Sequence, residues 1–139
     1  MAQIEKAIKD KLISLAVEAR KASYSPYSKY PVGAAVLTAS GKTYTGCNIE
    51  NSSFGLTNCA ERTAIFKAVS EGERKIAAIA IAAKASSPCG ACRQVLSEFA
   101  APEIPVIFVN LKDSGEKEIE DHTLGELLPC SFNQEEAGL

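Results

Sequence analysis

The sequence constrains the fold most strongly between residues 76 and 110. Residues 76–83 (IAAIAIAA) are a continuous apolar run, short enough to be a strand that is buried on both faces. A helical pattern follows at about 89–100 (CGACRQVLSEFA), and PVIFVN at 105–110 is a second buried strand. A strand, a helix and a strand in this order predict a right-handed parallel crossover within one sheet.

The segments on either side add to this unit. Apolar residues recur at helical spacing before YSPYSKYP, whose prolines and serines end a helix. Two strand-like runs, VGAAVL and TYTGCNI, flank a short turn with glycine and predict a β-hairpin. Toward the end, we expect a charged turn, LKDSGEKEIED, and then a short helix around TLGELL. The elements expected before residue 76 are a helix at 3–22, strands at 32–37 and 43–49, and a helix at about 59–70.

Composition narrows the class of protein. The chain has 139 residues, 46% of them hydrophobic and 23% charged, so we expect one globular domain over 1–139. Its net charge is −2 and its lysines and arginines are scattered, which disfavours binding to a nucleic acid. We find no signal-peptide pattern and no apolar run of membrane-spanning length, so we expect a cytoplasmic protein with no membrane partner. Thiols stay reduced there, and five cysteines cannot all pair within the chain.

Three of these cysteines stand where helices are expected to begin. Cys89 and Cys92 are one helical turn apart, so their sulfur atoms can converge. This CxxC pattern alone is typical of either a redox dithiol or half of a zinc site. Cys59 favours a metal if its helix begins beside that of Cys89. The helix dipoles would then favour the thiolate form that a metal requires.

The number of ligands distinguishes a structural metal site from a catalytic one. A structural zinc site needs a fourth protein ligand, and the candidates Cys47, Cys130 and His122 have no motif spacing. Three ligands and one solvent position are the catalytic pattern. Glu61, two residues after Cys59, would then be placed to move protons. The alternative interpretation is that Glu61 only interacts favourably with the helix dipole.

The motif CAE at 59–61, followed by PCGAC at 88–92, resembles the paired signature of the zinc-dependent cytidine deaminases. YSPYSKYPVGAAVL, GCNIEN, CAERTAIFKAVSEG and SPCGACRQVLSEF extend the resemblance over most of residues 20–100, to the small homotetrameric type. The resemblance implies a three-layer α/β/α deaminase fold with a mixed sheet of about five strands. It also implies one zinc ion per chain and hydrolysis of cytidine or deoxycytidine to the uridine nucleoside and ammonia, as in pyrimidine salvage.

The resemblance also implies roles for individual residues. Cys59, Cys89 and Cys92 would bind zinc, and Glu61 would carry the water proton to ring N3 and a second proton to the leaving amino group. Asn48 and Glu50 match positions that hold the ribose hydroxyls, although both also suit a polar turn. Substrate contacts are further implied for Tyr30, where the family usually has Phe, for Ala60, and for Phe132, which would reach a neighbouring subunit's site in a homotetramer. The alternative for Phe132 is a hydrophobic residue that only docks the tail. Phe54 and Cys130 replace a frequent Tyr and a common Gly.

Charge at the metal suggests one more role. Three thiolates on Zn²⁺ leave a net charge of −1, which raises the pKa of a bound water. Arg62 lies three residues after Cys59 on the same helical face, so we expect it to offset this charge. Arg93 is a weaker candidate because it directly follows Cys92, and adjacent residues diverge on a helix. Arg62 could instead be a simple surface arginine.

Three functions stay open at this point. The first is a zinc hydrolase acting on a free pyrimidine nucleoside, and a deaminase acting on another small substrate, such as a nucleoside antibiotic, is closely related to it. The second is a redox protein that uses Cys89 and Cys92 as a dithiol. The third is a binding module with a closed zinc site.

Overall fold

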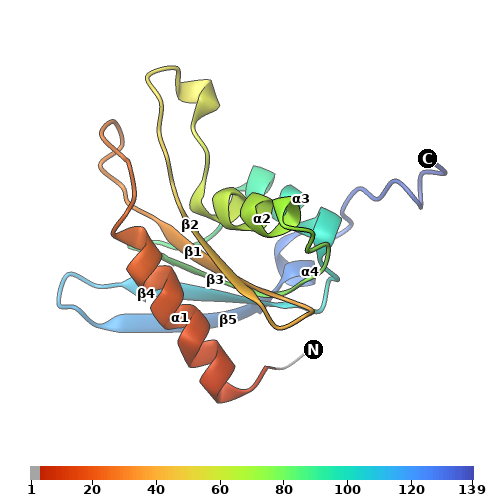
Figure 1. The fold of residues 1–139 in the computed structure, drawn as a ribbon, viewed down its shortest axis with the longest axis horizontal. Helices are drawn as coiled ribbons and strands as arrows, with labels where there is room; N and C mark the ends of the chain where they lie inside the picture. The colour runs from red at the N-terminus through yellow and green to blue at the C-terminus, as the bar shows by residue number, and fades with distance from the viewer. Residues whose placement is uncertain (1–3) are drawn as a thin grey trace.

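The computed structural model describes residues 4–139, which form a five-stranded mixed sheet with helices on both faces (Figure 1). The strands lie in the order β2-β1-β3-β4-β5. This is the three-layer α/β/α arrangement and the strand number that the resemblance implied. The elements are α1 (Lys6–Arg20), β1 (Gly33–Thr38), β2 (Thr43–Cys47), the 3-10 turn η1 (Phe54–Leu56), α2 (Ala60–Ser70), β3 (Ile76–Ala83), α3 (Gly90–Phe99), β4 (Pro105–Leu111), β5 (Lys117–Thr123) and α4 (Leu124–Leu127).

The predicted crossover is confirmed. β3 pairs with β4 in parallel, with Ile81 opposite Phe108, and α3 connects the two strands. The predicted hairpin is also confirmed, since β1 pairs antiparallel with both β2 and β3. The helix expected at 3–22 is α1; residue 3 lies outside the described part of the chain.

The alternating side chains of β3 explain how one strand serves two cores. Ile79 and Ile81 face α2 and α3, whereas the alternating alanines at 78, 80 and 82 face α1. Small side chains on that face let α1 lie close to the sheet. Gly33 on β1 extends this close approach, because a Cβ there would overlap the backbone of α1 at the carbonyl of Ala16.

The segment LKDSGEKEIED is not only a turn, and the sequence prediction was wrong there. β5 (Lys117–Thr123) pairs antiparallel with β4 along its whole length. Most of its side chains are exposed, so the strand has no apolar run that reveals it. Its stability comes from the buried neighbour β4, which offers a free edge to the charged segment.

The layers fix where a site can form. α2 and α3 cover the same face of the sheet and begin close together, at the carboxyl end of β3 (Figure 1). Helix starts present free N–H groups and positive dipole ends, so this corner suits anionic ligands. No helix among residues 4–139 is both long and apolar enough to cross a membrane.

Candidate active site

Three thiols converge where α2 and α3 begin. Cys59 and Cys89 are the residues directly before these helices, and Cys92 lies in the first turn of α3. The Sγ atom of Cys89 is 3.9 Å from that of Cys59 and 3.5 Å from that of Cys92. All three thiols are free. The two helix starts thus lie side by side, which is the condition under which Cys59 favours a metal site.

The donor set fits a zinc ion. The three sulfur atoms lie within 4.8 Å of one another, and no other His, Cys, Asp or Glu of residues 4–139 joins their group. His122, considered above as a fourth ligand, instead pairs with Glu120 at 3.2 Å and with Glu126 at 3.6 Å. Soft thiolate ligands select zinc over hard cations, and three protein ligands leave one position open.

Arg62 contacts this cluster as predicted. Its Nη2 atom lies 3.3 Å from Sγ of Cys59, one helical turn away. Hydrogen bonds from Cys92 and Arg62, together with the charge of Arg62, lower the pKa of the Cys59 thiol to about 5. The pKa of Cys92 is raised by its hydrogen bond to Cys59 and by burial. Without a metal, Cys59 therefore loses its proton more readily than Cys92.

Glu61 lies in the first turn of α2, and its side chain points into the interior. It is only 5% exposed, and this burial raises the pKa of its carboxyl above the ordinary value. A carboxyl with a raised pKa exchanges protons closer to neutral pH, as a general acid and base must. Interaction with the helix dipole alone would not require this burial.

A cavity of about 390 Å³ opens beside the thiols and Glu61. Most of its walls come from residues 28–32, the start of α2 and the loop 85–89, and Asn48, Thr57 and Ile81 complete them. Ala60 and Glu61 line it together with Cys59 and Cys89. This volume lies within the range of small-ligand sites.

Asn48 and Glu50 are close to this cavity but largely engaged with the protein. The Asn48 amide accepts from Ser23 and from the Val32 N–H at 2.9 Å, and donates to the Tyr30 carbonyl at 2.8 Å. Its second N–H is left for a ligand. Asn48 lines the cavity beside the thiols.

The Glu50 carboxylate lies in an adjoining hollow that Phe54 also lines. It accepts hydrogen bonds from the Ser28 hydroxyl and from the N–H groups of Tyr27 and Ser28. The Ser28 hydroxyl and these N–H groups lower the pKa of Glu50, so it is an anion at neutral pH. We assigned no role to Ser28 from the sequence.

The two aromatic candidates differ in position. Tyr30 lines the cavity, and its hydroxyl also contacts the backbone of Ala85 at 2.6 Å. Phe132 is 62% exposed on the C-terminal tail and lines a separate surface hollow. Phe132 therefore does not line the cavity beside the thiols in a single chain.

Sequence reasoning missed how the loop before Cys89 is held. The Ser86 hydroxyl and N–H both bond to the Asn110 side chain, at 2.7 and 3.1 Å. Asn110 follows a buried strand run, which is a common place for a polar site residue, but only the fold brings it to Ser86.

Comparison with known proteins agrees with this geometry. Residues 6–108 match the sequence model of the cytidine and deoxycytidylate deaminase zinc-binding region. The chain belongs to this deaminase family. It is 52% identical over 130 residues to a cytidine deaminase of Sporosarcina psychrophila, covering 91% of this chain and 93% of that protein.

Solved structures of this family have the same fold. A cytidine deaminase from Burkholderia pseudomallei is 44% identical and has a TM-score of 0.81, over 88% of this chain and 98% of that one. The cytidine deaminase of Mycobacterium tuberculosis is 35% identical with a TM-score of 0.76, over 90% and 97% of the two chains. The predicted deaminase fold is thus confirmed.

Proposed function

We propose that this deaminase hydrolyses cytidine and deoxycytidine, releasing ammonia and uridine or deoxyuridine for pyrimidine salvage. One observation carries the proposal: a buried carboxyl, Glu61, lies beside three convergent thiols at a cavity that can take a nucleoside. The similarity to proteins named cytidine deaminase, over about nine tenths of the chain, supports the choice of substrate.

The thiols of Cys59, Cys89 and Cys92 would hold one zinc ion. When bound, zinc supplies Lewis acidity that lowers the pKa of a water molecule toward about 7. Arg62 would offset the negative charge of three thiolates through its contact with Cys59.

Glu61 would accept and donate the protons that the reaction transfers. It accepts a proton from the attacking water as the new C4–O bond forms, and delivers this proton to N3 of the ring. It then transfers the second water proton to the amino group, and the C4–N bond breaks to release ammonia. Its raised pKa supports this role, because the carboxyl must hold a proton between the two transfers.

The cavity walls would orient the nucleoside. The planar ring of Tyr30 would pack on the pyrimidine, and Ala60 at the start of α2 would contact the base. Asn48, with one free N–H, and the anionic Glu50 would bind the ribose hydroxyls. Their bonds within the protein hold these groups in place before a ligand arrives.

We also propose that the protein acts as a homotetramer with sites at subunit interfaces. Phe54 and Leu56 are 71% and 72% exposed beside the hollow that contains Glu50. Exposed apolar side chains gathered at a binding site are typical of an interface. Phe132 would enter a neighbour's site from the exposed tail.

We place the protein in the cytoplasm as a single domain over residues 1–139. Five free cysteines, three of them needed as thiolates, suit a reducing compartment. Its net charge of −2 and the scattered positions of its lysines and arginines disfavour a nucleic acid as a partner.

The direct test is to incubate the purified protein with cytidine and follow its ultraviolet spectrum, together with ammonia release. Conversion to the uridine spectrum with one ammonia per nucleoside is the expected result. A zinc protein that leaves cytidine unchanged would be a binding module or a deaminase for another nucleoside. A protein without zinc that forms a reversible disulfide between Cys89 and Cys92 would be a redox protein.

A further inference from the structure

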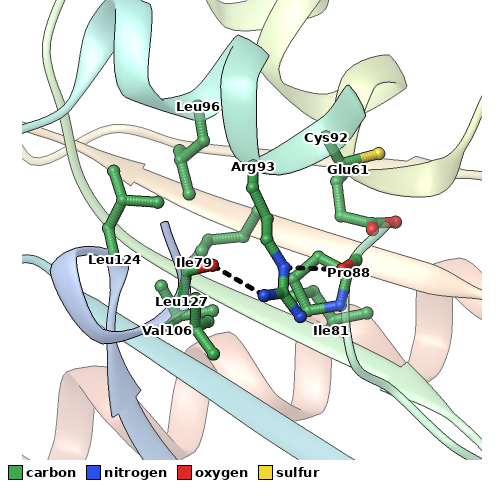
Figure 2. Close-up of a pocket in the computed structure, with 10 residues that line it drawn as sticks. All are labelled: Glu61, Ile79, Ile81, Pro88, Cys92, Arg93, Leu96, Val106, Leu124 and Leu127. Carbon is green, nitrogen blue, oxygen red and sulfur yellow. Dashed lines mark hydrogen bonds between the residues drawn. The ribbon is translucent and has the colours of Figure 1, made fainter. Parts of the chain in front are cut away.

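Arg93 makes three hydrogen bonds around the start of α3, and Figure 2 shows those to Pro88 and Leu127. Its Nε donates to the Pro88 carbonyl at 2.8 Å, its Nη2 to the Ser87 hydroxyl at 2.9 Å, and its Nη1 to the Leu127 carbonyl at 2.7 Å. None of these three acceptors is a thiol, so Arg93 makes no hydrogen bond to the cluster as Arg62 does. Its bonds instead hold the chain around the thiols.

These bonds enclose two of the thiols. Pro88 directly precedes Cys89, and Arg93 directly follows Cys92. The bond from Arg93 to Pro88 closes a ring of chain that contains both cysteines. The backbone N–H of Arg93 also donates to the Cys89 carbonyl at 3.1 Å, which fixes the same turn from inside.

The third bond connects this ring to α4. The Leu127 carbonyl belongs to the last turn of that helix, where no later N–H of the helix is available to it. Leu96 of α3 and Leu124 of α4 lie in one buried apolar cluster, and a small void of about 10 Å³ beside them is also lined by Arg93 (Figure 2). Apolar packing of this kind has no fixed direction, whereas a hydrogen bond does. Arg93 therefore supplies the directional contact between the two helices.

We propose that Arg93 is a positioning residue that holds Cys89 and Cys92 in the geometry a zinc ion needs, and that makes this geometry depend on α4. The inference rests on the proposed zinc site. A guanidinium suits this task because its planar fork reaches three acceptors at once, whereas a lysine ammonium cannot match their directions. Groups that orient metal ligands typically change metal affinity about 10–100-fold when they are altered.

Zinc release to an excess of a strong chelator, followed by a zinc-sensitive dye, measures this role without any substrate. Arg93→Lys should release zinc about tenfold faster than the unchanged protein. Ser87→Ala, which removes one bond of three, should have a smaller effect of about twofold. Arg74→Lys is the matched control, because Arg74 also donates to backbone carbonyls, Val69 and Glu73, but on an exposed surface.

A general loss of stability is separated by a second measurement. The metal-free forms of Arg93→Lys and Arg74→Lys should unfold at similar denaturant concentrations, because Arg93→Lys leaves the apolar packing of Leu96 against Leu124 and Leu127 in place. Faster release with equal metal-free stability supports positioning. If Arg93→Lys releases zinc faster and its metal-free form also unfolds at a lower denaturant concentration than that of Arg74→Lys, the inference is overturned.

The dependence on α4 has its own test. Thr123 caps α4 by accepting from the Glu126 N–H at 3.3 Å, so Thr123→Ala should loosen the helix. Thr123→Ala should speed zinc release when Arg93 is present, but should have little further effect on the release rate of Arg93→Lys. If the effects of Thr123→Ala and Arg93→Lys on the rate of zinc release are additive, Arg93 does not connect the thiols to α4.

The remaining outcomes are also decisive. An Arg93→Lys protein that releases zinc at the unchanged rate overturns the inference. If Arg93→Lys does not fold, an unchanged rate in Ser87→Ala overturns it instead. If the protein without any substitution takes up no zinc, the proposed function itself is contradicted. That result is distinct from a failure of the inference about Arg93.

Discussion

The Nη2 atom of Arg62 lies 3.3 Å from Sγ of Cys59, so a guanidinium donates directly to one of the three thiols. Three thiolates and Zn²⁺ carry a net charge of −1, and a positive neighbour offsets this charge. The contact also raises the pKa of Arg62 itself, chiefly through the hydrogen bond to Cys59. The two residues therefore stabilise each other's charged form.

This relationship predicts coupling between substitutions at the two positions. Arg62→Gln should lower cytidine turnover about tenfold, the effect of losing a hydrogen bond to a charged group. Adding Cys59→His removes one negative charge and should recover part of the loss. The measurement is a double-mutant cycle for turnover at matched zinc occupancy, with Arg74→Gln as a surface control. If the two substitutions lower turnover additively, or by more than the sum of their separate effects, while zinc stays bound, Arg62 does not compensate the charge.

The acidity of Cys59 gives a prediction for the metal-free protein. Because its pKa is lowered to about 5, Cys59 should remain a thiolate, and be alkylated by iodoacetamide, down to about that pH. Arg62→Gln should raise the midpoint of this alkylation profile. Peptide mapping after alkylation at each pH identifies the residue. An unaltered midpoint in the variant would contradict the hydrogen bond as a cause.

Glu50 gives a prediction for stability against pH. Its folded pKa is lowered from 4.5 by the Ser28 hydroxyl and the N–H groups of Tyr27 and Ser28. A lowered folded pKa means that the ionised group stabilises the fold above the unfolded pKa, and that this stability is lost as pH falls through the folded value. Glu50→Gln should therefore unfold more easily than the unchanged protein at pH 7, and the difference should shrink below about pH 4.

Urea titrations at several pH values measure this difference. Glu103→Gln, a change at an exposed carboxylate, is the control and should show little change at either pH. A Glu50→Gln deficit that is as large in acid as at pH 7 would mean that packing, not ionisation, is responsible.

The exposed tail predicts an effect across subunits. A chain that ends before Phe132 should still assemble, but its Michaelis constant for cytidine should rise, because the aromatic ring is lost from a neighbour's site. Light scattering gives the assembly state and steady-state rates give the constant. An oligomer with an unchanged Michaelis constant and rate would exclude this role for the tail.

The sequence predicts the metal-binding corner well because its geometry is local. Cys89 and Cys92 lie on one turn, and Arg62 lies one turn after Cys59, so helical spacing alone places them. The convergence of Cys59 with the other two thiols needed one further step, the parallel crossover that sets α2 beside α3.

Contacts between distant segments could not be predicted from local spacing in the sequence. Arg93 reaches Leu127, 34 residues later, and β5 is a charged strand that depends on β4 for its pairing. Glu50 is held by backbone N–H groups at residues 27 and 28, which carry no signal in side-chain chemistry. Each of these features depends on tertiary packing rather than on a local pattern.

The proton transfer by Glu61 is the central step of the proposed reaction, and one comparison tests it most directly. Cytidine turnover by Glu61→Gln is measured beside Glu71→Gln, which makes the same change at the exposed end of the same helix. Both variants are compared at one zinc per chain and with unchanged circular dichroism. We expect Glu61→Gln to lose about a thousandfold in turnover, because an amide cannot accept the proton, while Glu71→Gln stays near the unchanged rate. Near-normal turnover by zinc-loaded Glu61→Gln would contradict the mechanism.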